Sequence, residues 1–329
     1  MISVNGFELP KENFLSGECH LSIPRNIMYE SSSTCLFTDD FNFDIVWLYE
    51  NDSELFSLRC VVKHIKNVHK DAFISLHLPY IPHARMDRVE DDSTIFTLKW
   101  FCEEINSLEF NQVTVRDPHS NVSVALLDKI SVEDIKGYLR LALCDAHERC
   151  ENFYQNTNEF GEPKGTFNGI FPIVLYFPDE GAYKRYKKLS DSIGSMSLSD
   201  EKTEFIKIYG SKVRDWKTGK IQSLELSFEN GSPWNAETLK MLANEYNYGV
   251  MMVDDIVSYG GTMFYSALKL KELGFKDIFA YATHVENSVL DREHGTLIKL
   301  LDDGTVKRLY TTRSIFNKEH ESIKIIEHD

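Results

Sequence analysis

Short apolar runs rich in β-branched and aromatic residues alternate along the chain with longer stretches whose apolar residues recur at helical spacing. This alternation predicts strand–helix–strand units, in which parallel strands form a sheet whose two faces are covered by helices. A polar stretch over residues 150–165, containing asparagine, glycine and proline, separates two such regions of the 329 residues. We therefore expect an α/β protein with two domains, residues 1–160 and residues 161–329, each containing one mostly parallel sheet.

Polar clusters follow four of the expected strands at the point where each strand ends. The strands are expected at residues 71–78, 113–116, 171–177, 249–253 and 276–283. Helices are expected from the capping pair Ser93 and Thr94 to Leu108 and over residues 262–273. In open α/β sheets the carboxyl ends of the strands form the usual ligand-binding edge. We therefore expect a site at that edge, built from Arg85, Asp87, Arg88, Asp117, His119, Asp179, Asp254 and Asp255.

The composition argues against several classes of partner. A net charge of −15 disfavours binding to a nucleic-acid backbone, although a small basic pocket for phosphates can coexist with an acidic surface. The six cysteines form no CxxC pair, which disfavours a structural zinc site and fits free thiols in the cytoplasm. We see no secretory leader and no apolar run near the roughly 18 residues that a membrane span needs. We therefore expect a cytoplasmic protein that binds neither nucleic acid nor membrane.

The string VMMVDDIVSYGGTMFYSALKLKELG, residues 250–274, joins an apolar strand, two carboxylates, a small-residue loop and a helix. Gly260 and Gly261 let backbone N–H groups approach an anion closely, and the helix N-terminus favours a phosphate. Asp254 and Asp255 can accept hydrogen bonds from ribose hydroxyls. Further hydroxyl donors come from Ser258, Tyr259 and Thr262. A bare Gly-Gly pair would also fit an ordinary strand–turn–helix, but the whole string favours a ribose-phosphate site.

Two arginines and a histidine follow earlier strands. In PYIPHARMDRV, residues 79–89, Arg85 and Arg88 flank Asp87, and two guanidiniums can grip phosphate oxygens or stack on a base. By themselves these residues fit a solvated loop equally well. His119 could ligate a metal or hold phosphates, whereas a lone histidine is more often structural.

A second pair of cations lies in GSKVRDWKTGKI, residues 210–221. Lys212 and Arg214 alternate on an extended piece that leads into a turn at Thr218 and Gly219. By itself the segment is typical of an exposed hairpin.

Six segments, in the same order, resemble the ribose-phosphate diphosphokinases, also called phosphoribosyl pyrophosphate synthetases. Residues 250–274 resemble the phosphoribosyl diphosphate loop of the type I phosphoribosyltransferases, and PYIPHARMDRV resembles the family's nucleotide-binding PY-x-P-x-ARQDR segment. The string RDPH resembles the family's DLH segment, and YFPDEGAYKR resembles SPDAGG-x-KR. KVR is similar to the Lys-x-Arg pair at the base of a mobile loop, and NFLSGE is weakly similar to F-x-D-G-E. The resemblance extends from about residue 13 to about residue 285.

The resemblance implies two type I phosphoribosyltransferase-like domains with the site between them, in a homo-oligomer built from dimers and often a hexamer. ATP would bind Arg85, Asp87, Arg88 and His119, and Phe14 and Glu18 from a neighbouring subunit. Mg²⁺ would be held by His119 and Asp179. The ribose phosphate would bind Asp254, Asp255, Ser258, Tyr259, Gly260, Gly261 and Thr262.

The implied reaction moves a diphosphate from ATP to ribose 5-phosphate. The C1 hydroxyl attacks the β-phosphorus of ATP, and AMP leaves. Placement and charge neutralisation by Mg²⁺, Lys212 and Arg214 would supply most of the rate. The sequence offers no candidate for a general base.

The chain departs from the family pattern mainly on the nucleotide side. Met86 stands where the family usually has glutamine, Ser16 replaces an acid, and residues 122–125 replace a glutamine-rich stretch. The spacing from His119 to Asp179 is also longer than in typical members.

Three alternatives follow from these departures. The Gly-Gly loop and the KVRDWKTGKI segment resemble a divergent, virus-encoded branch that performs the same chemistry on ADP-ribose in NAD salvage. A non-catalytic regulatory relative would tolerate the changes on the nucleotide side, but it would not need the intact Lys212, Arg214 and phosphate loop. A plain phosphoribosyltransferase would not need the Arg85 segment.

Overall fold

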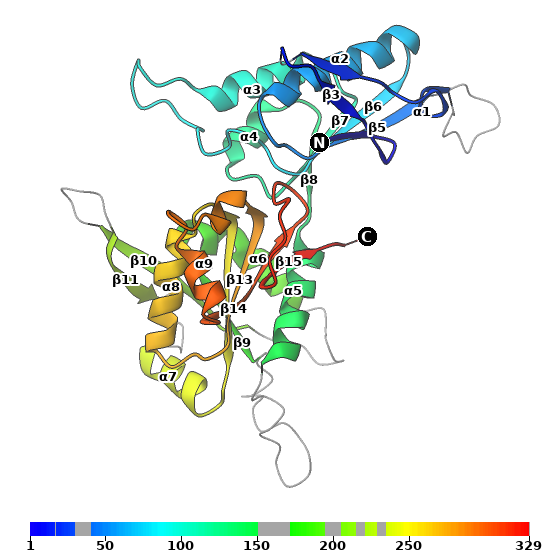
Figure 1. Ribbon diagram of the computed structural model, residues 1–329. Helices are drawn as coiled ribbons and strands as arrows, with labels where there is room; N and C mark the ends of the chain where they lie inside the picture. The colour runs from blue at the N-terminus through cyan, green and yellow to red at the C-terminus, as the bar shows by residue number, and fades with distance from the viewer. Residues whose placement is uncertain are drawn as a thin grey trace. The chain divides into compact units, whose positions relative to one another are not determined.

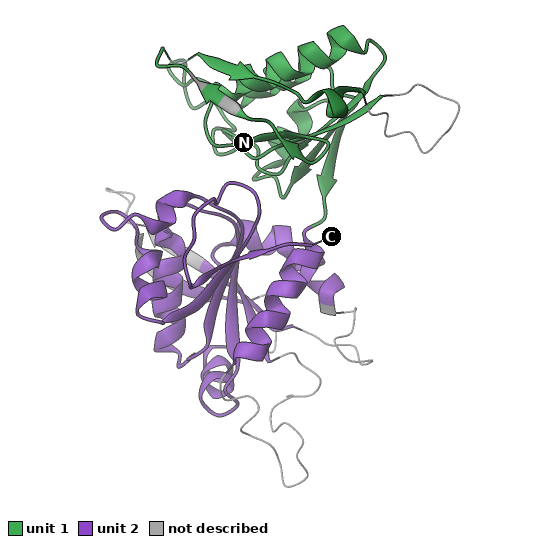
Figure 2. Ribbon diagram, turned by 45° about the vertical axis from the view of Figure 1, so that its right-hand side comes forward, with its two compact units in different colours: residues 1–134 green, residues 135–329 purple. Residues whose placement is uncertain are grey.

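The computed structural model describes residues 1–16, 18–29, 41–150, 172–194, 205–214, 221–228 and 235–328, without the side chains at positions 11, 13, 211–214 and 221–224. The chain divides into two compact units, Met1–Asp134 and Ile135–Asp329 (Figure 2). Each unit holds one main sheet, as the sequence predicted. The division comes earlier than the expected boundary after residue 160, because helix α5 (Lys136–Arg149) packs into the core of the second unit.

The first unit is built on a sheet with the strand order β2-β1-β5-β6-β7-β8 (Figure 1). Strands β5 to β8 are parallel, and β1 pairs antiparallel with β5 at one side. The strands are β1 Ile2–Val4, β2 Phe7–Glu8, β5 Asn42–Trp47, β6 Phe73–Leu78, β7 Gln112–Arg116 and β8 Ile130–Glu133, with a separate hairpin of β3 Lys11–Asn13 and β4 Cys19–Leu21. The helices are α1 Arg25–Tyr29, α2 Ser53–Val68, α3 Thr97–Asn106 and α4 Asn121–Leu126.

Helices cover one face of this sheet. Along β5, Phe43, Ile45 and Trp47 are buried against α2 and α3, whereas Asp44 between them is exposed. Strand β6 repeats the alternation, with Ser75 on the less buried face. Among the residues described in this unit, the expectation of helices on both faces therefore holds for one face only. The strands alternate apolar with polar residues, which is typical of a sheet with one solvated face.

The second unit contains a larger sheet, with the strand order β11-β10-β9-β12-β13-β14-β15. All neighbours are parallel except β10 and β11, which form an antiparallel hairpin. The strands are β9 Ile173–Phe177, β10 Lys207–Arg214, β11 Ile221–Ser227, β12 Gly249–Val257, β13 Ile278–Val285, β14 Val306–Thr312 and β15 Ile323–Ile326. Besides α5, the helices are α6 Glu180–Gly194, α7 Ala236–Asn244, α8 Gly261–Glu272, the 3-10 turn η1 Asn287–Leu290 and α9 Leu297–Asp302. No helix in the described stretches is long and apolar enough to span a bilayer.

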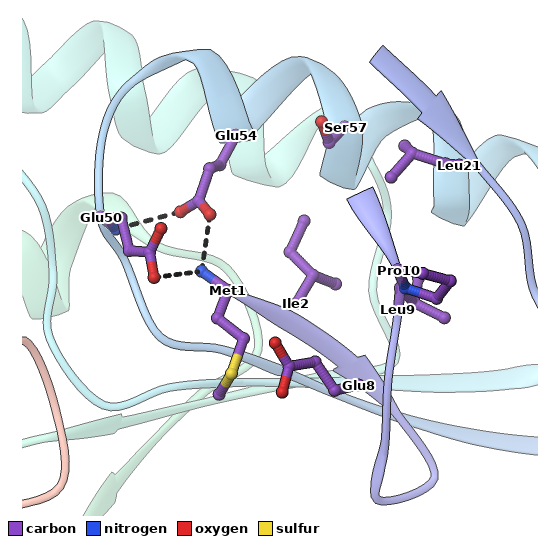
Figure 3. Close-up of a pocket in the computed structure, with 9 residues that line it drawn as sticks. All are labelled: Met1, Ile2, Glu8, Leu9, Pro10, Leu21, Glu50, Glu54 and Ser57. Carbon is purple, nitrogen blue, oxygen red and sulfur yellow. Dashed lines mark hydrogen bonds and ion pairs between the residues drawn. The ribbon is translucent and has the colours of Figure 1, made fainter. Parts of the chain in front are cut away.

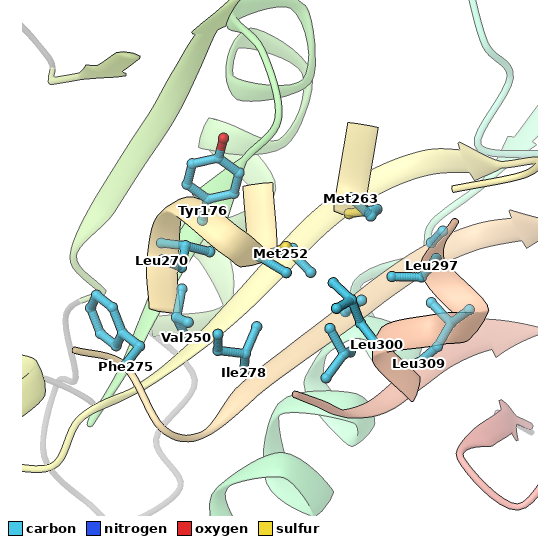
Figure 4. Close-up of a cluster of buried hydrophobic side chains, with 14 of the residues drawn as sticks. Tyr176, Val250, Met252, Met263, Leu270, Phe275, Ile278, Leu297, Leu300 and Leu309 are labelled. Carbon is cyan, nitrogen blue, oxygen red and sulfur yellow. The ribbon is translucent and has the colours of Figure 1, made fainter. Parts of the chain in front are cut away.

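Both faces of the second sheet are buried, because strand β12 at its centre is apolar on both sides. Val250 and Met252 pack against Leu270 of α8 and against residues of α9 (Figure 4). Met251 and Val253 pack on the opposite face, against α5 and α6. A central parallel strand is therefore sandwiched between two helical layers, as the sequence predicted.

Two predicted elements differ from the structure. Strand β12 continues to Val257, four residues beyond the predicted end, so Asp254 and Asp255 belong to the strand itself. Helix α3 begins at Thr97 and has no side-chain cap. Ser93 does not cap it, because its backbone N–H and its hydroxyl donate to Asp91 in a separate turn.

A network of charged and hydroxyl groups ties helix α5 to the last strands of the second sheet. Asp145 of α5 accepts hydrogen bonds from Tyr310 Oη at 2.7 Å, Lys324 Nζ at 2.7 Å and Arg149 Nε at 2.8 Å. Burial alone would raise the pKa of Asp145, but these three donors lower it well below its ordinary value. The network explains why α5 belongs to the second unit.

Candidate functional site

Three carboxylates gather at the carboxyl edge of the second sheet. Strands β9 and β12 are parallel neighbours, with Tyr176 paired to Met252, so Asp179 and the Asp254–Asp255 pair leave the sheet at the same edge. Asp179 precedes α6, and its Oδ1 accepts a hydrogen bond from the backbone N–H of Ala182 at 3.0 Å. The topology therefore brings together acids that are about seventy-five residues apart in the sequence.

The two adjacent aspartates have different surroundings. Asp255 is 8% exposed, and its Oδ2 lies 3.1 Å from Nη1 of Arg185 on α6. Asp254 is half-buried, and its Oδ1 accepts a hydrogen bond from the backbone N–H of Asp255 at 3.0 Å. Burial, followed by the charge of Asp255 and then that of Asp179, raises the pKa of Asp254 well above 3.8. The edge thus concentrates three acidic side chains, which suits a cation or hydroxyl donors.

A tight glycine turn joins this strand to helix α8. Gly260 caps the helix with φ +81°, in the left-handed region that favours glycine. A Cβ at this position would also lie 2.3 Å from Cβ of Leu297, so any side chain would clash. At Gly261 a Cβ would meet Oγ1 of Thr296 at an ordinary 3.9 Å. The two glycines therefore have different roles, and the structure requires only Gly260 for backbone geometry.

The segment that follows β13 clamps this turn. The backbone N–H of Thr296 donates to the carbonyl oxygen of Tyr259 at 2.9 Å, and Oγ1 of Thr296 donates to the same oxygen at 3.1 Å. The backbone N–H of Glu286 donates to the carbonyl oxygen of Val257 at 2.8 Å. Sequence reasoning missed both residues, because they lie outside every motif and contact the turn from a distant part of the chain.

The side chains of the turn differ in accessibility. Ser258 Oγ donates to Oε2 of Glu286 at 2.6 Å, so a contact with phosphate would have to replace this bond. Tyr259 is 45% exposed, and its ring centroid lies 6.0 Å from that of His294. Thr262 is half-buried in the first turn of α8.

Strand β10 carries the predicted catalytic pair, Lys212 and Arg214, whose side chains lie outside the described part of the structure. The strand packs closely on β9, because a Cβ at Gly210 would lie 2.3 Å from Oη of Tyr176 and 2.9 Å from the carbonyl oxygen of Pro178. The backbone at Lys212 is therefore two residues from a point of contact with β9, the strand that leads to Asp179.

The first unit presents the predicted nucleotide-side residues at the carboxyl ends of two adjacent strands. Arg85, Asp87 and Arg88 follow β6, and His119 follows β7, its parallel neighbour. Asp87 is mostly buried, and its Oδ1 lies 3.7 Å from Nε of Arg88, which is 78% exposed. Arg85 is exposed, and His119 is half-buried. The predicted cluster thus shares one edge of the first sheet.

A contact that the sequence did not reveal holds the loop that contains Arg85, Asp87 and Arg88. His83 has a left-handed backbone with φ +62°, and its Nε2 lies 3.0 Å from Oδ1 of Asp52 at the start of α2. Met86 is half-exposed, and its sulfur accepts a hydrogen bond from Oγ1 of Thr97 at 3.1 Å. The Met86 sulfur therefore contacts helix α3. At this position the ribose-phosphate diphosphokinases usually have the side-chain amide of a glutamine.

A second missed cluster lies beside His119. Arg116, at the end of β7, donates from Nε to Oε2 of Glu133 at 2.9 Å and from Nη2 to Oε1 at 3.0 Å. His77 Nε2 lies 3.0 Å from the same carboxylate. The bidentate ion pair between Arg116 and Glu133 thus holds the end of β7, from which the loop with His119 begins.

Phe14 and Glu18 lie at the tip of the β3–β4 hairpin. The backbone N–H of Phe14 donates to the carbonyl oxygen of Glu18 at 2.8 Å, and Ser16 Oγ donates to Oε2 of Glu18 at 2.7 Å. Phe14 is 61% exposed. Ser16 thus fixes the Glu18 carboxylate and leaves the aromatic ring accessible.

A pocket of ≈ 400 Å³ in the first unit is unrelated to the predicted site residues (Figure 3). Its lining includes Glu8, Glu50 and Glu54, and Glu54 accepts hydrogen bonds from the amino group of Met1 and from the backbone N–H of Glu50. This acidic lining does not suit a phosphate.

The described residues contain no group of three or more His, Cys, Asp and Glu side chains arranged as a metal cage. Mg²⁺ is usually held by one or two carboxylates together with substrate phosphates, so a full protein cage is not needed for it. The carboxylates of Asp179 and Asp254 fit such a shared site.

We predict opposite effects of alanine at the two glycines. Gly260→Ala should lower the free energy of unfolding by about 1–3 kcal/mol, because it adds backbone strain and a clash with Leu297. Gly261→Ala should keep or slightly raise it, because alanine favours a helical backbone. Urea unfolding of both variants tests this, and equal losses would contradict the assigned geometry.

We also predict that Asp254→Asn stabilises the fold. Because the folded-state pKa of Asp254 lies above 3.8, its ionisation costs stability as the pH rises from that value. The Asn variant lacks this cost, so its gain in melting temperature over the wild type should grow with pH. A gain that shrinks as the pH rises would show that the carboxylate is compensated.

Comparisons with known proteins complete the description of the site. No family model matches the chain. A ribose-phosphate pyrophosphokinase of Saccharolobus solfataricus is 21% identical over 285 residues, which cover 87% of this chain and 79% of that protein. The ribose-phosphate pyrophosphokinase of Bacillus subtilis is 23% identical over 252 residues, 76% of this chain and 62% of that protein.

A solved structure resembles the whole described fold. The crystal structure of phosphoribosylpyrophosphate synthetase from Mycobacterium smegmatis matches with a TM-score of 0.61 and 15% identity, covering 97% of this chain and 85% of that chain. The α/β fold with two mostly parallel sheets is therefore confirmed as the type I phosphoribosyltransferase fold. The chain is thus similar in sequence to ribose-phosphate pyrophosphokinases and similar in fold to a phosphoribosylpyrophosphate synthetase.

Proposed function

We propose that the protein transfers the diphosphate of ATP to the C1 hydroxyl of ribose 5-phosphate, giving phosphoribosyl diphosphate and AMP. The observation that carries this proposal is the position of Asp254 and Asp255 near the end of β12, a few residues before the glycine turn that opens helix α8. Carboxylates suit ribose hydroxyls, and a helix N-terminus with closely approachable N–H groups suits the 5-phosphate. A single strand–turn–helix segment thus offers carboxylates to the ribose hydroxyls and backbone N–H groups to the 5-phosphate.

The ATP side is proposed from the first unit. Arg85, Arg88 and His119 leave adjacent parallel strands, and their charges suit a triphosphate. The hairpin tip with Phe14 and Glu18 supports contact with the ATP of a neighbouring subunit, which would require a homo-oligomer.

Charge neutralisation would supply most of the rate. Mg²⁺, when bound, would offset charge on the phosphates, and Asp179 and Asp254 would be its protein ligands in the second unit, with His119 on the ATP side. The repulsion that raises the pKa of Asp254 supports a cation at this edge. Lys212 and Arg214 would add fixed positive charge to the diphosphate in transfer.

A larger acceptor with the same reacting group is the second candidate. Tyr259 lies within the turn itself and His294 lies beside it, and both rings are exposed, at 45% and 63%. Aromatic surfaces beside a phosphate site can stack on a base. This pair supports ADP-ribose, whose reactive ribose carries a nucleoside beyond its 5-phosphate.

We predict that AMP forms from ATP only when a 5-phosphorylated ribose is present. The purified protein would be given ATP and Mg²⁺ with ribose 5-phosphate, with ADP-ribose, or with neither. Faster AMP release with ribose 5-phosphate supports the first candidate, and faster release with ADP-ribose supports the second. No AMP with either acceptor would contradict both and favour a non-catalytic regulatory relative.

We further predict that Lys212→Ala lowers turnover by about 10²-fold to 10³-fold, a loss typical of removing one group that stabilises transition-state charge. ATP affinity should stay nearly unchanged, because the contribution arises during transfer. Lys188→Ala, at an exposed position of α6, is the matched control and should leave turnover intact. Near-normal turnover in Lys212→Ala would remove this residue from the mechanism.

A further inference from the structure

Helix α6 places a cation beneath the acidic edge of the second sheet. Arg185 lies in the second turn of α6, and its guanidinium contacts Asp255 at 3.1 Å. The sequence resemblance placed Lys184 and Arg185 together at the end of YFPDEGAYKR and assigned neither a separate role. In the structure Arg185 is 29% exposed, whereas Lys184 is 71% exposed.

The two aspartates divide between the faces of the sheet. Successive residues of a strand point to opposite faces. Asp255 follows the pattern of Met251 and Val253, which pack against α5 and α6, and Arg185 belongs to α6. Asp254 follows the pattern of Val250 and Met252, which pack against α8, the helix that the glycine turn opens. Asp255 is thus held from the side of α6, and its neighbour Asp254 interacts with it directly.

We propose that Arg185 is a positioning residue, which holds Asp255 through the ion pair and thereby fixes the orientation of the Asp254–Asp255 pair that receives the ribose hydroxyls. The inference rests on the proposed function. Asp254 Oδ1 already accepts the backbone N–H of Asp255, so the placement of Asp255 determines the placement of Asp254.

A buried carboxylate needs its partner. Asp255 is 8% exposed, and a buried charge without a counter-ion is strongly unfavourable. Without Arg185, Asp255 would lose this ion pair, and a shift of its carboxylate would disturb the adjacent Asp254. The pair of Lys184 with Glu180 is different, because both side chains are mostly exposed and such pairs contribute little.

The first test compares Arg185→Gln, Arg185→Lys and Lys184→Gln. Arg185→Gln should raise the KM for the sugar-phosphate acceptor by on the order of 10-fold to 100-fold, the usual cost of losing a residue that orients a ligand-binding group. The KM for ATP should stay unchanged, Arg185→Lys should restore part of the loss, and Lys184→Gln should match the wild type. Equal changes in both KM values, or a loss that tracks only the folded fraction, would overturn the proposal.

The second test asks whether Arg185 acts through Asp255. The single variants Arg185→Gln and Asp255→Asn are compared with the double variant. If Arg185 works by holding Asp255, the double variant is no worse than the more affected single variant. Effects that add in free energy would overturn the proposal, since they would show that the two residues act separately.

Calorimetric binding of ribose 5-phosphate and ADP-ribose, without ATP, separates this inference from the proposed function. If the wild type forms no AMP but binds an acceptor more tightly than Arg185→Gln, the proposed reaction is wrong and the positioning role stands. If both proteins bind the acceptor equally, the positioning role is wrong whatever the reaction. If the wild type binds neither acceptor, both are wrong.

Discussion

The negative charge gathered at the carboxyl edge of the second sheet is the constraint on which the proposed site depends. Parallel pairing of β9 with β12 brings Asp179 to the same edge as Asp254 and Asp255, and Arg185 compensates one of these charges. Burial and the neighbouring carboxylates raise the pKa of Asp254, so the negative charge at this edge favours a counter-charge. A ligand that brings hydroxyl groups and a divalent cation offsets it, and a ribose phosphate with Mg²⁺ is such a ligand.

The glycine turn that we propose as the phosphate site is held in place by another segment. Thr296 and Leu297 close over the turn from the side of α9, one by hydrogen bonds to Tyr259 and one by occupying the space next to Gly260. Gly260 is needed for two reasons: Leu297 approaches it closely, and its backbone has a positive φ. Preorganisation of this kind suits a reaction in which placement and charge supply most of the rate.

The sequence predicted the fold class, the sheet of each unit and the strand–turn–helix at residues 250–274, because apolar runs and glycine turns are local signals. It missed the true end of β12, since a charged pair such as Asp254–Asp255 ordinarily marks a strand end. It also missed Glu286, Thr296 and the ion pair of Arg185 with Asp255, because these contacts join segments that are far apart in the chain. Apolar and polar residues alternate around Asp44, and this alternation indicates a sheet with one exposed face. We expected helices on both faces because parallel sheets are usually covered on both.

The fate of the β-phosphorus of ATP tests the central claim most directly. Phosphorus NMR can follow the wild-type protein with ATP, Mg²⁺ and a ribose 5-phosphate or ADP-ribose acceptor. The account predicts that the β- and γ-phosphorus signals move together to a diphosphate ester on C1, with one AMP formed for each ester. Release of inorganic phosphate with ADP, or of free diphosphate without a sugar ester, would contradict it.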